Sequence, residues 1–261
     1  MDINKLHEYG IEFKDRLCLR SFPLAVKLLK KEADIPKNTK RPKDDFGYRM
    51  SLCQGYAMSR RDGTPITMLK EDMWCFEPVI GYGLAEPPEQ FLKGYNRFPE
   101  DVETLEAGSH YAEEFPRFQI GKYMGITSAP LFTVNFIPDL VIFYCDSIQL
   151  NSLLLGLEYR DGYGITCHLS SHAACVYTVV PLMQTGQCQV AVPCRGDHYQ
   201  AMAGDDEVIF AAPKSKLVDI LDGLRHCDKY GWRLPRNHYM ACEPEQRESY
   251  MKIGRMAGMD I

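Results

Sequence analysis

Apolar residues fall into short continuous runs that alternate with helical patterns, most regularly in the second half of the chain. Residues 138–145 read P-D-L-V-I-F-Y-C and predict a central strand, because a strand covered on both faces has few polar positions. Residues 146–159 are amphipathic and begin with Asp146 or Ser147, either of which can cap a helix. Residues 215–231 predict another helix, with apolar positions on one face and Gly231 beyond its end.

The other patterns are shorter and less regular. We expect further strands at 24–29, 65–69, 121–131, 164–169, 188–194 and 207–213, and helices at 3–18, 53–61, after 75 as far as 84, twice within 85–120 and from about 171 to 183. Residues 30–50 are polar and contain prolines, which predicts a loop. The succession predicts an α/β fold, a compact globular chain in which helices flank a mixed sheet.

The length of 261 residues allows one large domain or two small ones. We expect a single domain over 1–261, which can divide into two lobes at about 1–135 and 136–240, followed by a C-terminal tail at 241–261. The chain is 45% hydrophobic and 25% charged, which is typical of globular proteins and leaves enough apolar material for a core.

Charge and hydropathy narrow the class of partner. The net charge of -5 argues against a nucleic-acid binder, which needs clustered lysine and arginine. The apolar runs are far shorter than the roughly 20 residues that span a bilayer, and the N-terminus lacks a signal pattern. We therefore expect a cytoplasmic protein whose partner is a small-molecule substrate or ligand, neither a nucleic acid nor a membrane. The sequence is compatible with a homo-oligomer.

Ten cysteines change this picture. In a reducing compartment, thiols indicate metal or redox chemistry more than structural disulfides. The chain has no C-x-x-C, so any metal site must be assembled from distant segments. Four cysteines fall at the ends of predicted elements, where functional residues concentrate: Cys53, Cys75, Cys175 and Cys194. Four thiolates can hold a 4Fe-4S iron–sulfur cluster.

The other cysteines suit a different role. Cysteine is among the most buried residue types, so an isolated one is usually part of the core. We expect this of Cys18, Cys145, Cys167 and Cys227, and Cys242 lies in the tail without a motif.

Residues 193–197 read P-C-R-G-D and suggest what a cluster would do. Arg195 adjoins Cys194, and a neighbouring cation favours the thiolate form. If three thiols bind, the open iron would act as a Lewis acid on a small anionic substrate. Asp197 or His198 would then move the proton, and Arg195 would hold the anionic group with two hydrogen bonds. If four bind, electron transfer or a structural cluster is expected.

Three other interpretations remain open at this point. The first is a cluster-free module that binds a small molecule in an apolar pocket, with Trp74, Tyr56, Arg195 and Asp197 as anchors. The second is a zinc site on the same thiols. The third is a thiol enzyme with Cys194 as nucleophile. The acidic run of Asp205, Asp206 and Glu207 is either a solvated turn or a carboxylate that points into the site.

Several motifs recur in the same order in a known family: C-Q-G-Y-A at 53–57, Cys75, G-L-A-E-P-P at 83–88, A-C-V at 174–176, P-C-R-G-D at 193–197 and D-D-E-V-I-F-A-A-P at 205–213. Over about residues 5–235 the chain resembles the uncharacterised prokaryotic family called domain of unknown function 169. Its members usually carry arginine after P-C-x-G-D, where this chain has His198, which puts in doubt any role that needs a permanent charge there. The resemblance implies a metal centre on the cysteines at positions 53, 75, 175 and 194, and it implies no substrate.

Overall fold

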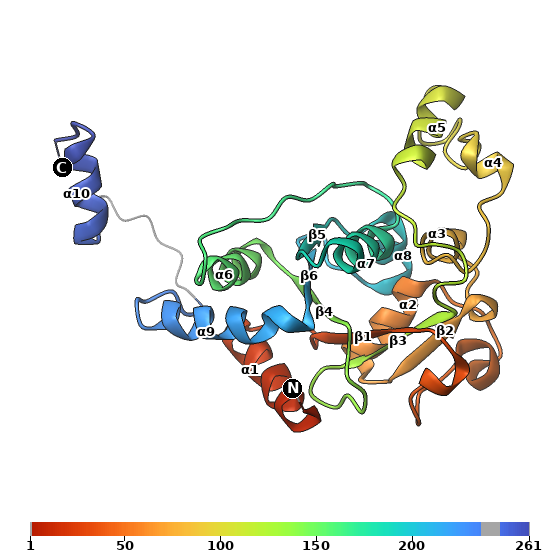
Figure 1. Ribbon diagram of the computed structural model, residues 1–261, viewed down its shortest axis with the longest axis horizontal. Coiled ribbons are helices and arrows are strands. Elements are labelled where there is room, and N and C mark those ends of the chain that lie inside the picture. Colours follow the sequence, from red (N-terminus) through yellow and green to blue (C-terminus); the bar gives the residue numbers. More distant parts are fainter. Residues whose placement is uncertain (1, 236–245, 261) are drawn as a thin grey trace.

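The computed structural model describes residues 2–235 and 246–260. In this part of the chain six strands form one sheet in the order β2-β3-β1-β4-β6-β5, and all pairings between them are antiparallel. The strands are β1 (Leu24–Leu29), β2 (Ile66–Leu69), β3 (Gly125–Pro130), β4 (Leu140–Cys145), β5 (Gln189–Ala191) and β6 (Val208–Pro213). Helices lie on both faces of the sheet, so the predicted α/β architecture is confirmed (Figure 1).

Strand β4 shows why its sequence is continuously apolar. Successive side chains of a strand point to opposite faces. Leu140, Ile142 and Tyr144 belong to one buried cluster, whereas Val141 and Phe143 belong to the cluster on the other face. Strand β1 pairs with β3 on one side and with β4 on the other, so the sheet continues across the boundary between the two expected lobes.

One face of the sheet carries α1 (Ile3–Leu17), α6 (Ser147–Glu158) and α9 (Leu217–Asp228) (Figure 1). Asp146 caps α6 by accepting hydrogen bonds from the backbone N–H groups of Ile148 and Gln149, as the sequence predicts. Helices α6 and α9 approach closely because both have glycine at the contact: a Cβ on Gly223 would lie 2.3 Å from the Gly156 carbonyl oxygen. We call this side the α9 face.

The opposite side, which we call the site face, carries α2 (Leu52–Ala57), α3 (Phe76–Gly81), α7 (Ala174–Thr185) and α8 (Arg195–Ala201) (Figure 1). Helix α2 packs against α8, and α3 packs against α7. The other helical elements are α4 (Glu89–Leu92), α5 (Leu105–Glu114), α10 (Glu248–Met256), short turns of 3-10 helix at Glu32–Asp34, Lys70–Asp72 and Lys214–Lys216, and π-helical turns at Pro42–Phe46 and Met58–Asp62.

Two strand predictions are wrong in this region. Residues 164–169 form no strand, because a side chain takes the place of a backbone partner at the edge of the sheet. The Cys167 Sγ, and not a backbone carbonyl, accepts the hydrogen bond from the Val190 N–H at 3.1 Å. The strand expected at 188–194 is limited to β5, since Cys194 already caps the next helix. No helix in residues 2–235 or 246–260 combines the length and apolar character needed to cross a membrane.

Candidate functional site

The four cysteines singled out by the sequence come together on the site face. Cys53, Cys75, Cys175 and Cys194 all line one cavity of about 530 Å³, which we call the cysteine pocket. Two of these thiols, on Cys53 and Cys175, are buried, and the other two are half-buried. Of the remaining predicted residues, Trp74 and Arg195 also line the pocket.

Each of these cysteines stands at the start of a helix. Cys53 and Cys175 are the second residues of α2 and α7, and Cys75 and Cys194 are the N-cap residues of α3 and α8. Because α2 packs on α8 and α3 on α7, the sheet brings four helix starts to one place. Unpaired backbone N–H groups at helix starts favour negative charge nearby, which suits thiolates and anionic clusters.

Gly196 leaves space between two of the thiols. A Cβ at this position would lie 3.5 Å from the Cys53 sulfur and 3.6 Å from the Cys194 sulfur. Both sulfurs are therefore close to one point, and they are no more than about 7 Å apart. The missing side chain leaves a gap beside the two sulfurs, which a larger residue would fill.

The thiols are held in their protonated form. Burial raises the pKa of Cys53 and Cys175 far above the ordinary value and raises the pKa of Cys75 and of Cys194 to about 12. The neighbouring thiols raise the pKa of Cys53, Cys75 and Cys175 further, because each thiolate would repel the others. Only the Cys53 sulfur has a side-chain hydroxyl within hydrogen-bonding distance among the described residues, the Ser51 Oγ at 3.0 Å.

The expectation that Arg195 lowers the pKa of Cys194 is therefore wrong. The guanidinium of Arg195 is exposed and lies 5.5 Å from the centre of the Tyr199 ring. Burial and the carboxylate of Asp197 dominate instead, and both raise the pKa of the Cys194 thiol. The start of α2 likewise does not offset burial at Cys53.

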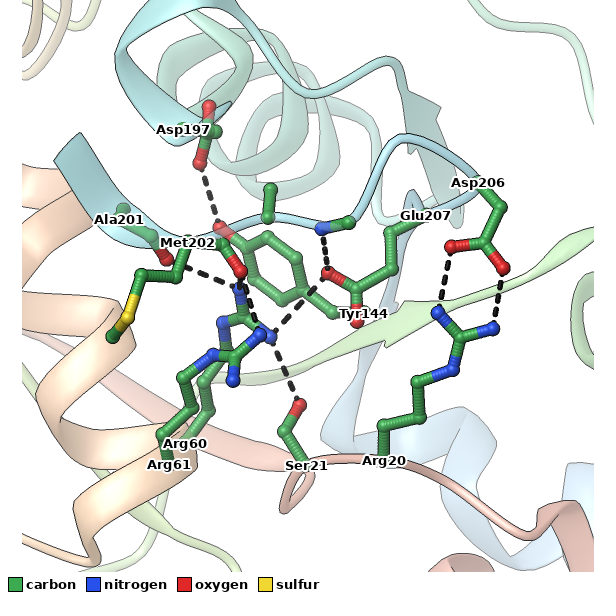
Figure 2. A network of polar contacts seen from close by, with 12 residues as sticks. Arg20, Ser21, Arg60, Arg61, Tyr144, Asp197, Ala201, Met202, Asp206 and Glu207 are labelled. Carbon is green, nitrogen blue, oxygen red and sulfur yellow. Dashed lines mark hydrogen bonds and ion pairs between the residues drawn. The ribbon is translucent and has the colours of Figure 1, made fainter. Parts of the chain in front are cut away.

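Asp197 lies on the inner side of α8 and does not line the cysteine pocket. Its carboxylate accepts a hydrogen bond from the Cys194 backbone N–H at 3.1 Å and from the Tyr144 hydroxyl at 2.9 Å. The Arg60 guanidinium lies 3.9 Å from the centre of the Tyr144 ring and forms a buried ion pair with Glu207 at 3.5 Å (Figure 2). Asp197 thus fixes the backbone of Cys194, and Asp197 is itself held by a buried polar network through the Tyr144 hydroxyl.

His198 and the acidic run at 205–207 do not line the pocket, whereas Gly196, Tyr199 and Gln200 of the same segment do. The His198 Nδ1 lies 3.2 Å from the Ala203 carbonyl oxygen, and His198 does not line the cavity. Asp206 pairs with exposed Arg20 (Figure 2), while Asp205 is exposed. The acidic run is therefore a solvated turn at its first two residues and a buried ion pair at Glu207. Tyr56 is a core residue whose hydroxyl faces that of Tyr82.

Sequence reasoning missed several polar residues that line the pocket, among them the ionisable side chains of Glu77 and His172. Burial raises the pKa of Glu77, whose Oε1 accepts a hydrogen bond from the Tyr111 hydroxyl at 3.1 Å. Burial also lowers the pKa of His172, which lies 3.3 Å from Asp101. The signal for Glu77 is in the sequence: it is an acidic residue within the apolar run W-C-F-E-P-V-I at 74–80.

The other cysteines lie away from the pocket. Cys145 is buried in the cluster on the α9 face, as expected. The expectation of a buried helix face is wrong for Cys18, which is exposed in the left-handed region at the end of α1. Cys167 and Cys227 are half-buried, and Cys242 lies outside the described residues. Among residues 2–235 and 246–260, no three His, Cys, Asp or Glu side chains are grouped so that they could hold a single metal ion.

The fold and the site define an α/β protein with one helix-flanked antiparallel sheet and a four-cysteine pocket on one face. The chain belongs to the family described as Uncharacterised ArCR (domain of unknown function 169), whose pattern matches residues 12–223. It is 23% identical over 230 residues to the uncharacterized protein MJ0308 of Methanocaldococcus jannaschii, an alignment that covers 87% of this chain and 96% of that protein. No solved structure matches the chain.

Proposed function

We propose that this protein binds a 4Fe-4S iron–sulfur cluster through Cys53, Cys75, Cys175 and Cys194. The observation that carries the proposal is the convergence of four thiols, from four separate segments, on one cavity. Metal-free, these thiols are costly to ionise, because they are buried and close to one another. A cationic metal centre reverses that preference, because its positive charge stabilises the neighbouring thiolates.

The residues around the thiols fit a cluster. Each of the four thiols stands at a helix start, where backbone N–H groups lack helical partners, and hydrogen bonds to cluster sulfurs tune the reduction potential. Gly196 leaves open a place beside the Cys53 and Cys194 sulfurs. Asp197 holds the Cys194 backbone in position. When bound, a cluster with four cysteine ligands supplies one-electron chemistry, and one with an open iron supplies a Lewis acid.

The test is anaerobic purification followed by iron and sulfide analysis and a visible absorption spectrum. We expect about four irons and four sulfides per chain, with the broad visible absorption of a cluster. Zinc in place of iron would support the zinc interpretation of the same thiols. A colourless protein that takes up neither iron nor sulfide after anaerobic reconstitution would contradict the proposal.

Single replacements by alanine show which thiols are ligands. Each of Cys53→Ala, Cys75→Ala, Cys175→Ala and Cys194→Ala should lose most of the iron bound by the native chain, because each removes one corner ligand. Cys145→Ala is the matched control: this thiol is also buried, but it packs on the α9 face and should leave the iron content unchanged. If one of these four variants keeps its full iron content, the cysteine replaced in it is not a ligand.

A further inference from the structure

A second cavity adjoins the cysteine pocket. It is a groove of about 370 Å³ whose lining includes Arg49, Lys70, Trp74, Cys75 and Phe76. Trp74 and Cys75 line both cavities, so the indole stands in the wall between them. We propose that this groove, which we call the Trp74 groove, binds the carboxylate or phosphate of a small ligand whose other end reaches Cys75. The proposal deepens the proposed function by adding a ligand next to the same site. Only the link between this ligand and a metal centre rests on the proposed function.

The charges of the groove point to an anion. Arg49 and Lys70 are both exposed, and neither makes an ion pair within residues 2–235 and 246–260. The acidic residue of the groove, Glu71, pairs with Arg41 at 2.7 Å, a cation that it shares with Asp44 and Asp72, so the groove lining itself has an excess of one positive charge. Two unneutralised cations therefore share one small groove in a chain whose net charge is -5. Like charges repel, and a bound oxyanion that accepts hydrogen bonds from both removes that repulsion.

The aromatic side chains define the rest of the ligand. The exposed fractions of Trp74 and Phe76 are 50% and 47%, which is high for large apolar side chains. Trp74 is nevertheless held in place, because its Nε1 donates to the Gln54 Oε1 at 3.3 Å. A fixed aromatic wall next to two cations favours a ligand with a flat or apolar part beside its anionic group. Neither inorganic ions alone nor neutral apolar molecules use both features.

Isothermal titration calorimetry tests the proposal with phenyl phosphate, phenylacetate and inorganic phosphate as probes. We expect saturable binding of at least one aromatic probe, and the better of the two identifies phosphate or carboxylate as the preferred group. Inorganic phosphate should bind more weakly than phenyl phosphate, because it makes no contact with the aromatic wall. In the double variant R49Q/K70Q the dissociation constant of the aromatic probe should rise at least tenfold, and binding should weaken as salt is added.

The matched control is K214Q/K229Q, which removes the same charge from exposed lysines near the two ends of α9. It should leave probe binding unchanged. Equal weakening in both double variants would overturn the proposal, since binding would then follow the overall charge. Absence of saturable binding with all three probes would overturn it as well.

Titrations of the metal-free and the iron-reconstituted protein separate this proposal from the previous one. Probe binding by the metal-free chain that is lost in R49Q/K70Q supports the groove even if no iron binds. Iron binding together with no probe binding overturns the groove and leaves the cluster proposal intact.

Discussion

The thiols of Cys75 and Cys194 are half-buried, and they keep their protons in the metal-free fold. Burial raises the pKa of both to about 12. A nucleophilic cysteine needs the opposite shift, because the thiolate is the reactive form. The interpretation of Cys194 as a nucleophile therefore gains no support from its surroundings. In contrast, a metal ligand is deprotonated when the metal binds, so a high pKa in the metal-free state only makes binding dependent on pH.

This retention of protons predicts how the stability of the metal-free protein depends on pH. Unfolded thiols ionise near the reference value of 9.0, whereas Cys75 and Cys194 keep their protons up to about 12. Between these values the native state binds more protons than the unfolded state, so the free energy of unfolding falls as pH rises. The limiting slope is about 1.4 kcal/mol per pH unit for each thiol.

Urea unfolding between about pH 8 and pH 10.5 measures this slope. Cys75→Ala and Cys194→Ala should each show a shallower decline than the native chain, because each lacks one of the groups that titrate. Tyrosines with raised pKa, such as Tyr144, contribute equally to all three proteins and cancel in the comparison. A decline of the same steepness in all three would mean that these thiols ionise in the native state as freely as in the unfolded chain.

At the scale of elements, the start of α8 depends on strand β4. Asp197 caps the helix by accepting the Cys194 N–H, and the Tyr144 hydroxyl from β4 donates to the same carboxylate. Asp197 is only 1% exposed, so water does not replace a lost hydrogen bond easily. The position of Cys194 is thus fixed by a strand that is far from it in the sequence.

Tyr144→Phe tests this dependence, because it removes the hydroxyl and keeps the ring beside Arg60. We expect a loss of about 1–3 kcal/mol in the free energy of unfolding, since the buried carboxylate loses one of its two partners. Tyr56→Phe is the control: its hydroxyl makes only a 3.5 Å contact with that of Tyr82, and its loss should cost less. Urea unfolding of the metal-free proteins measures the free energy lost in each variant. Equal losses would contradict the inference that the Tyr144 hydroxyl supports the start of α8.

Element boundaries were predictable where the pattern is local. The apolar run at 138–145 and the capped helix after it are found as β4 and α6, because burial on both faces and a capping aspartate are visible in the sequence. The strand expected at 164–169 failed because a side chain, the Cys167 thiol, bonds to the edge of the sheet. Such a contact depends on which segments become neighbours, and periodicity contains no information about that.

The candidate site was predictable to a similar degree. Cysteines at element ends could be selected from the sequence, and all four line one pocket. The burial that raises their pKa values could not be foreseen, because it depends on the packing of four helices. The same holds for the pairing of Arg60 with Glu207 and for the groove that contains Arg49 and Lys70. These residues are far apart in the sequence and carry no motif of their own.

At the scale of the whole molecule, one sheet connects the two halves of the chain. Strand β1 from the first half pairs with β4 from the second, and helices from both halves cover the site face. The α9 face has its own close contact, where a Cβ on Gly223 would lie 2.3 Å from the Gly156 carbonyl oxygen. Strain introduced on one face should therefore reach the other through the sheet.

Gly223→Ala should lower the free energy of unfolding by about 1–3 kcal/mol, because the added methyl group forces α6 and α9 apart. In a W232F background, Trp74 fluorescence reports on the site face and far-ultraviolet circular dichroism on the whole chain. We expect the two unfolding transitions to coincide in the parent and to shift together in Gly223→Ala. A Trp74 transition that stays in place would show that the two halves unfold as separate lobes.

The spacing of the four cysteines also has a consequence for biosynthesis. Cys53 and Cys75 leave the ribosome at least 100 residues before Cys175 and Cys194. A nascent or truncated chain presents only half of the pocket, so whatever the pocket holds can be loaded only after translation has passed α8. Loading would then serve as a check that translation has passed residue 201.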